Sequence, residues 1–213
     1  MLAFKLGGAW LWLSWLAVAL AMVALNYLLF GAGGFQKQAD GRLSPAATVL
    51  LAPYLLGAWI NSRLWTFRKP APSQVVEGID LGRLPAMGDL GGYAALVDLC
   101  AELPLQHTPQ NYCSLPSLDL VAPDALTCQR AAEAIENLRH KGPVLVCCAL
   151  GYSRSATAVA AWLLHSGRCQ GVDAAAVALI RQARPQVVLG PQHLAALQSM
   201  VDAQPGLEVA HAG

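Results

Sequence analysis

Residues 144–164 constrain the fold of this chain more than any other segment. The run at 144–148 is short and apolar, which is typical of a buried strand, and the run at 156–164 is typical of a buried helix. Gly151 permits a tight turn between them. In this order of elements the first N–H groups of the helix point back into the turn, and converging N–H groups at a helix N-terminus bind anions. The segment therefore predicts an α/β sheet with an anion-binding loop at its carboxyl edge.

Two side chains of this loop suit a phosphate group. Cys148 ends the strand, where the field of a helix N-terminus favours the nucleophilic thiolate. Arg154 follows after five intervening residues and offers a planar fork that can hold two oxygens. A cysteine and an arginine at this spacing also occur by chance, as a buried thiol and a surface charge. The preceding strand, the turn, the Ser155 hydroxyl and the following helix together favour the phosphate-binding interpretation.

The loop resembles the signature loop of the cysteine-dependent protein tyrosine and dual-specificity phosphatases, because Cys148, Gly151, Arg154 and Ser155 stand at the matching positions. Similar stretches extend over about the C-terminal two thirds of the chain, at residues 77–85, 97–102, 115–120 and 184–185. The resemblance implies an α/β fold, a small dual-specificity-phosphatase-like sheet flanked by helices. It also implies a phosphoric monoester hydrolase, as a membrane-anchored member of bacterial type.

The resemblance further implies a reaction in two steps. Cys148 attacks phosphorus while Arg154 and the loop N–H groups bind the equatorial oxygens, and Asp119 protonates the leaving alcohol. Water then attacks the cysteinyl phosphate, with Asp119 taking a proton and the Ser155 hydroxyl supporting the departing thiolate. The expected substrate-binding loop comprises Ala149, Leu150, Gly151, Tyr152, Ser153 and Arg154. This chemistry requires neither a metal nor a cofactor.

Three aspartates compete for the role of general acid. Asp119 lies in a loop followed by a proline and matches the general-acid position of the family. Asp124 directly precedes a helical run and suits a helix N-cap. Asp98 stands at the end of a strand-like run and suits the fixing of a backbone turn. We therefore expect Asp119 to be the acid, with Asp124 as the alternative.

Cys147 occupies the position before the nucleophile, where the family usually has a histidine that braces the loop and favours the thiolate. The replacement predicts that Cys148 forms its thiolate less readily than in a typical member. Cys147 is either an inert packed thiol, which we favour, or a redox partner of Cys148. Adjacent cysteines lack the spacing of a structural zinc site, so we expect no metal here.

Two apolar segments precede the region of resemblance. The chain is 55% hydrophobic and 13% charged, which is too apolar for an ordinary soluble domain. Residues 6–35 contain no charged residue, and a second apolar segment follows with a proline inside it. These features predict two transmembrane helices, at about residues 8–30 and 43–60. A signal peptide is the alternative for the first segment, and a buried or interfacial helix is the alternative for the second.

The predicted domains are an N-terminal membrane anchor at residues 1–69 and a catalytic domain at residues 73–213, joined by a proline-rich linker. Lys37 and Arg42 lie between the two apolar segments. The basic residues outside the segments are Lys5, Arg63, Arg68 and Lys69. The positive-inside rule places both ends of the anchor in the cytoplasm, and a nucleophilic thiol needs such a reducing compartment. We predict a multi-pass membrane protein with a cytoplasmic catalytic domain.

Pattern and turn residues predict the elements of the catalytic domain. The expected strands are at residues 75–81, 94–99, 112–115 and 143–148. The expected helices are at residues 125–140, 155–166, 173–183 and 191–203. Asp124 suits the start of the first helix, and Gly142 and Gly167 suit the ends of the first and second.

Three functions agree with these features. The first is hydrolysis of phosphotyrosine, phosphoserine or phosphothreonine in proteins. The second is hydrolysis of a phospholipid with a monophosphate headgroup, such as phosphatidylglycerophosphate; the uncharged loop residues Ala149, Leu150 and Tyr152 argue against headgroups with several phosphates. The third is an inactive, phosphate-binding adaptor. The net charge of +1 gives no reason to expect nucleic acid as a partner, and the sequence does not define the oligomeric state.

Overall fold

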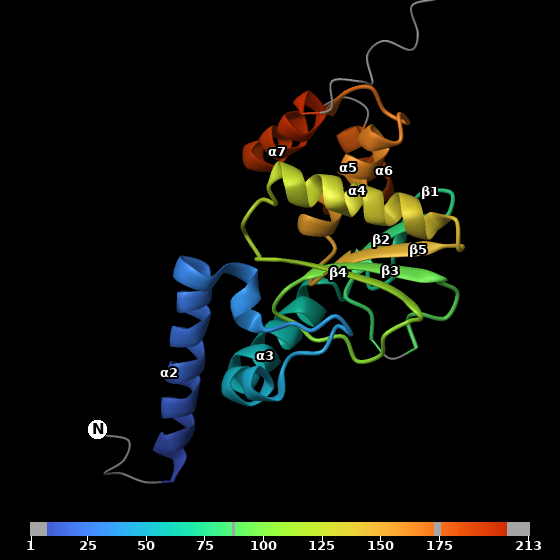
Figure 1. Cartoon of the computed structure of the whole chain (residues 1–213). Coiled ribbons are helices and arrows are strands. Elements are labelled where there is room, and N and C mark those ends of the chain that lie inside the picture. Colours follow the sequence, from blue (N-terminus) through green and yellow to red (C-terminus); the bar gives the residue numbers. More distant parts are fainter. Residues whose placement is uncertain (1–7, 87, 173–175, 204–213) are drawn as a thin grey trace, which may run out of the picture.

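A five-stranded mixed sheet forms the centre of the fold in the computed structural model, which describes residues 8–86, 88–172 and 176–203 (Figure 1). The strand order is β1-β2-β5-β3-β4. Only β1 and β2 are antiparallel among these neighbours, and the other pairs are parallel. The strands are β1 (Ser73–Val76), β2 (Ile79–Arg83), β3 (Ala95–Cys100), β4 (Asn111–Ser117) and β5 (Val144–Cys148). The central strand β5 is buried along its whole length, as expected for a parallel strand covered on both faces.

Four helices cover one face of the sheet (Figure 1). They are α4 (Ala125–Arg139), α5 (Arg154–His165), α6 (Val177–Ala183) and α7 (Pro191–Asp202). In α5 every residue from Arg154 to Leu164 is buried, because the helix lies between the sheet and its neighbouring helices. This burial explains why the segment has no polar face in the sequence.

The other face of the sheet is covered by α3 (Pro45–Trp65) and by loops (Figure 1). A smaller cluster fills this side, and it includes Leu145, Cys147 and Ala149. Cys148 belongs instead to the main core beside α5. The two cysteines therefore lie on opposite faces of β5, as the alternation of side chains along a strand requires.

One helix among the described residues is long and apolar enough to cross a membrane. It covers Trp12–Phe35, with a mean hydropathy of 2.0 over its most apolar part. It includes most of α2 (Ala9–Leu25) together with η1 (Asn26–Phe30) and η2 (Gly31–Phe35). Length and composition alone support this assignment. The first predicted span, at about 8–30, agrees with this helix to within a few residues.

The second span, predicted at about 43–60, is not supported, because among the described residues only the helix at Trp12–Phe35 is long and apolar enough to cross a membrane. The segment does form a helix, α3, but its C-terminal turns are docked on the catalytic domain. Ser62 Oγ donates to Ala149 O at 2.6 Å, and Arg63 donates to Leu84 O at 3.1 Å. The end of α3 that follows the predicted span is therefore bound to the catalytic domain.

Lys37 joins the segment after η2 to the catalytic domain. Its ammonium lies 2.6 Å from Asp98 Oδ2, and it also donates to the carbonyls of Cys100 and Leu103, with the side chains of Lys37 and Asp98 fully buried. Burial alone would lower the pKa of Lys37, but the attraction of Asp98 outweighs it and raises the pKa. Lys37 is therefore part of the folded domain rather than a charge in a loop between two spans.

The expected elements of the catalytic domain are present with one correction. The single strand predicted at 75–81 is instead the hairpin of β1 and β2, which turns at Gly78 with φ 79°. Asp124 caps α4 by accepting from Thr127 N at 2.7 Å, as predicted. The start of the helix predicted at 173–183 includes 173–175, which lie outside the described residues; α6 begins at Val177.

Candidate active site

The loop between β5 and α5 turns back on itself over Cys148, as the order of strand, glycine and helix predicts. Gly151 has φ 74°, a region that favours glycine. A Cβ atom at this position would lie 2.4 Å from the backbone of Gly82 in β2. Both the conformation and the close approach therefore exclude any larger residue.

Two donors point at the sulfur of Cys148. The Gly151 N–H donates to Sγ at 3.3 Å and the Ser155 hydroxyl donates to it at 3.2 Å. The sulfur lies in front of the first turn of α5, whose N–H groups carry partial positive charge. Two hydrogen-bond donors and a helix N-terminus therefore converge on the sulfur of the expected nucleophile.

Arg154 is held by acceptors from two other parts of the chain. Its guanidinium donates to both Glu102 oxygens, at 2.8 and 2.6 Å, and to Ser117 O at 2.8 Å. Its side chain is 1% exposed. Burial alone would raise the pKa of Glu102, but the attraction of Arg154 outweighs it and the pKa is lowered. The pair is therefore charged, and it fixes the guanidinium in one orientation.

Glu102 was not identified as a site residue from the sequence. It lies two residues beyond the end of β3, in one of the stretches of resemblance. The available signal was the position of this acidic residue directly after a buried strand. Buried carboxylates are rarely left without a cation, so the position indicated a cationic partner. Its partner, 52 positions away, was not visible in any local pattern.

Asp119 is the one of the three candidate aspartates that reaches the site. Its Oδ1 lies 3.0 Å from Arg154 Nη2, and its side chain is 38% exposed, so it is open to an incoming molecule. The next residue, Leu120, has φ 59°, which is strained for a residue with a side chain. Asp124 is occupied as the α4 cap, and Asp98 binds Cys100 N at 2.8 Å and Lys37.

The predicted loop residues are each tied to surrounding elements. Arg184 donates to Leu150 O at 3.4 Å, and His193 Nε2 lies 2.7 Å from Ser153 Oγ. The remaining contacts are Ser62 Oγ to Ala149 O, Val188 N to Tyr152 O and Tyr152 OH to Trp65 O. His193 is a further residue that contacts the loop, and the local sequence gave no signal for it. Because α3, α6 and α7 all take part, the loop is positioned by most of the fold.

Cys147 takes no part in this network. It faces the opposite side of β5 and pairs in register with Asp98 of β3. Burial raises the pKa of the Cys147 thiol, and the nearby Asp98 raises it further. The thiol is therefore uncharged, which agrees with a packed side chain.

A cavity of about 360 Å³ adjoins the site. Asp119, Leu150 and Glu102 line it from the catalytic domain, and Leu16 and Leu20 line it from α2. The site is thus continuous with a space bounded by the candidate membrane helix. Among the described residues, no group of three or more His, Cys, Asp or Glu side chains is arranged to hold a metal ion.

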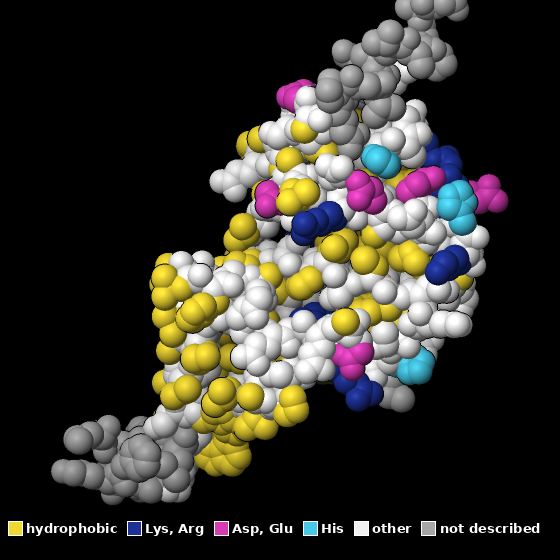
Figure 2. Space-filling model, in the orientation of Figure 1, with side chains coloured by type: hydrophobic (Ala, Val, Ile, Leu, Met, Phe, Trp, Pro, Cys, Tyr) yellow, Lys and Arg dark blue, Asp and Glu magenta, His cyan; other side chains and the backbone are white. Residues whose placement is uncertain are grey.

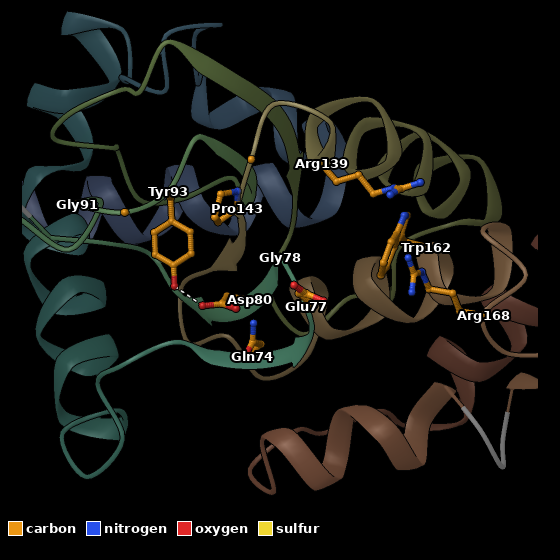
Figure 3. Close-up of a pocket in the computed structure, with 12 residues that line it drawn as sticks. Gln74, Glu77, Gly78, Asp80, Gly91, Tyr93, Arg139, Pro143, Trp162 and Arg168 are labelled. Carbon is orange, nitrogen blue, oxygen red and sulfur yellow. Dashed lines mark hydrogen bonds between the residues drawn. The ribbon is translucent and has the colours of Figure 1, made fainter.

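A larger cavity, of about 640 Å³, lies at the other edge of the sheet (Figure 3). Pro143 lines it and directly precedes β5, whereas Cys148 ends β5, so this cavity lies at the amino ends of the strands. Within it, the Tyr93 hydroxyl donates to Asp80 Oδ2 at 2.5 Å. None of its lining residues belongs to the Cys148 loop, so we place the candidate site at the carboxyl edge.

Comparison with known domains identifies the family of this chain. The family model of the dual specificity phosphatase catalytic domain matches residues 95–202, about half of the chain. The chain belongs to this family of phosphatases. No curated protein sequence matches the chain.

Solved phosphatase structures share the fold. Human DUSP28 is 25% identical with a TM-score of 0.55, over 63% of this chain and 95% of that one. A mouse putative dual specificity phosphatase, solved with zinc tungstate, is 25% identical with a TM-score of 0.54, over 63% of this chain and 88% of that one. PTPMT1 in complex with PI(5)P is 18% identical with a TM-score of 0.50, over 62% of this chain and 95% of that one, a likeness of fold alone.

Proposed function

We propose that this protein hydrolyses phosphomonoesters through a cysteinyl-phosphate intermediate, with its catalytic domain held at a membrane by α2. The geometry at Cys148 carries the proposal: its sulfur accepts from Gly151 N–H and the Ser155 hydroxyl, beside the N-terminus of a buried helix. A binding-only adaptor has no use for a nucleophile placed in this way, so we set that alternative aside.

In the first step the Cys148 thiolate attacks phosphorus, and the bond to the leaving oxygen breaks. Arg154 and the N–H groups of residues 149–154 bind the equatorial oxygens, where charge is concentrated in the transition state. Asp119 gives its proton to the leaving oxygen. The distance of 3.0 Å between Asp119 Oδ1 and Arg154 Nη2 supports this role.

In the second step a water molecule attacks the cysteinyl phosphate and the sulfur departs as thiolate. Asp119, now ionised, takes a proton from the water. The Ser155 hydroxyl stabilises the departing sulfur, to which it already donates at 3.2 Å. Glu102 acts through Arg154 by holding both guanidinium ends, so it is a positioning residue.

The membrane attachment rests on the apolar helix at Trp12–Phe35. With one span, the two ends of the chain lie on opposite sides of the membrane, which replaces the earlier expectation of both ends in the cytoplasm. Lys37 binds the catalytic domain, so the chain from this residue onward lies on the same side as the site. The free cysteines of the described chain support a reducing compartment, the cytoplasm, for that side.

Substitution of the two adjacent cysteines tests the proposal. In the full chain in detergent, Cys148→Ser should abolish hydrolysis of p-nitrophenyl phosphate, whereas Cys147→Ser should retain it. Acid quenching followed by mass spectrometry should find phosphate on Cys148 in the wild-type protein during turnover. If Cys148→Ser remains active, the nucleophile lies elsewhere and the proposed mechanism is wrong.

A further inference from the structure

We infer that the N-terminal helical segment holds the general acid in its catalytic position while α2 lies on the catalytic domain, with Tyr27 of η1 as the positioning residue. Movement of α2 into a bilayer withdraws this support. The inference rests on the proposed phosphatase function and names a regulation of the same site. The family match begins at residue 95, so the support comes from outside the matched domain.

Tyr27 reaches the loop that carries the general acid. Its side chain forms a hydrogen bond with the backbone of Asp119, and it lies near the charges of Glu102 and Arg154. A bond to the backbone fixes the position of Asp119 without occupying its carboxyl group. The carboxyl group stays available for proton transfer, with Oδ1 at 3.0 Å from Arg154 Nη2.

The residues on either side of Asp119 show why the loop needs this support. Leu118 packs against an apolar cluster that includes the fully buried Phe35, and α2 packs against the same cluster. On the other side, Leu120 has φ 59° and is 91% exposed. A strained residue of this kind persists only where its surroundings fix the backbone. The N-terminal segment supplies that restraint through the Leu118 cluster and the Tyr27 contact.

The position of α2 in the structure excludes a bilayer around it. The helix lies beside α3 (Figure 1), and Leu16 and Leu20 line the 360 Å³ cavity together with Glu102 and Asp119. These two leucines belong to the half of the candidate span that is farther from Lys37. If α2 crossed a membrane in this position, the carboxylates would lie within the hydrocarbon, where charge is costly. Docking on the domain and crossing a bilayer are therefore two alternative positions of α2.

The surface of α2 suits both positions. Trp12 and Val18 are 67% and 49% exposed, and Figure 2 shows hydrophobic side chains gathered over this part of the molecule. An apolar face of this kind is favoured in lipid. The helix is interrupted at Gly31, which has φ 62°, and a glycine there allows the chain to change direction while Lys37 stays bound to Asp98. Such a movement takes η1 away from the acid loop.

The first test compares the two positions of α2. The quantity measured is the ratio of kcat for phenyl phosphate, whose leaving group needs protonation, to kcat for p-nitrophenyl phosphate, whose leaving group needs little. Val18→Arg disfavours insertion but leaves the new side chain exposed in the docked position. With phosphatidylcholine vesicles, the ratio should be about fivefold higher for this full-length variant than for the reconstituted wild-type protein. Leu126→Arg, on α4, is the matched control and should keep the wild-type ratio.

The second test asks whether Tyr27 acts through Asp119. In the Val18→Arg chain, Tyr27→Phe keeps the ring and removes the hydroxyl, and the ratio should fall about fivefold. In a chain that also carries Asp119→Asn, the same substitution should have no further effect, because the acid that Tyr27 positions is already absent. Tyr54→Phe makes the matched change in another tyrosine that lines the cavity and should leave the ratio unchanged.

The outcomes separate this inference from the proposed function. Equal ratios for the wild-type protein and Val18→Arg in vesicles would overturn the coupling to the membrane. An unchanged ratio in Tyr27→Phe, or a loss that persists in full beside Asp119→Asn, would overturn the positioning role. In these cases turnover of p-nitrophenyl phosphate still supports a phosphatase. A protein inactive on both substrates would instead overturn the proposed function, and this inference with it.

Discussion

The catalytic loop and the α2 helix are held to the rest of the molecule in different ways. Loop residues 149–153 are fixed by directional hydrogen bonds from α3, the end of α6 and α7. In α2, Trp15 donates to Val49 O at 3.1 Å, while Leu13 and Val18 are about half exposed. Chemistry needs atoms in fixed places, whereas attachment to a membrane needs apolar length and surface. Single substitutions should therefore have steep effects in the loop and gradual effects in α2.

The largest effect is expected at Gly151. In Gly151→Ala the new Cβ would lie 2.4 Å from the Gly82 backbone. The loop must therefore move away from β2, and its N–H groups no longer converge on one position. Removing one such donor typically costs about 10²–10³-fold in kcat, and here the whole set is displaced. The measurement is p-nitrophenyl phosphate turnover, with Gly171→Ala as the control. Activity near the wild-type level would show that the loop is less tightly constrained than its contacts indicate.

The next effect concerns the general acid. Asp119→Asn should slow an alkyl phosphate by about 10²–10⁴-fold, with a smaller loss for p-nitrophenyl phosphate, whose leaving group needs less protonation. Asp124→Asn is the matched control, because that carboxylate is occupied as the α4 cap. A larger defect in Asp124→Asn than in Asp119→Asn would move the role to Asp124.

Glu102→Gln should weaken both the site and the fold. Breaking a buried ion pair costs about 3–5 kcal/mol of stability, measurable by denaturant unfolding, and inhibition by inorganic phosphate should weaken because Arg154 loses its orientation. The pKa of Glu102 is lowered in the folded state. The stability that Glu102 contributes is therefore present above its ordinary pKa of about 4.3 and is lost as pH falls through the folded value. A stability difference from wild type that persists in strong acid would contradict this assignment.

A smaller, pH-dependent effect is expected at His193. Burial lowers its pKa, and Gly190 N–H donates to Nδ1, so the neutral ring carries its proton on Nε2 and donates to Ser153 Oγ. Protonation adds a proton to Nδ1, which then no longer accepts from Gly190 N–H, so this bond is present above the ordinary pKa of about 6.5 and is lost as pH falls through the lower folded value. Losing one such bond should reduce kcat/KM about fivefold. His193→Gln should remove this fall in kcat/KM from the acidic side of the pH profile. An unchanged profile would show that His193 has only a packing role.

The smallest effect on chemistry is expected in α2. Val18→Arg should release protein from carbonate-washed membranes, since arginine inside a span costs up to about 2.5–3.5 kcal/mol. Hydrolysis of p-nitrophenyl phosphate in detergent should stay within about twofold, as for ordinary surface changes. Leu126→Arg, at a similarly exposed position on α4, should leave fractionation unchanged. Equal release by both variants would show that α2 is not the anchor.

The α2 and α3 helices show which contacts the sequence alone did not predict. Both segments are apolar and of similar length, and both were predicted as spans. Among the described residues only the first meets the length and hydropathy of a span. The α3 helix instead contacts the catalytic domain through Ser62, which binds Ala149, 87 residues away. That contact joins residues far apart in the chain, so the sequence of the segment alone does not reveal it.

The sequence by itself determined the local parts of the site: the strand, the turn at Gly151, the buried helix α5 and the Asp124 cap. Each depends on residues that are neighbours along the chain, whose conformational preferences act before any tertiary contact forms. Only the tertiary structure decided the rest. The pairing of Glu102 with Arg154 and the contact of His193 with Ser153 join residues 52 and 40 positions apart. A buried charge or ring takes whichever partner the packed sheet and helices bring within reach, and no local pattern encodes that partner.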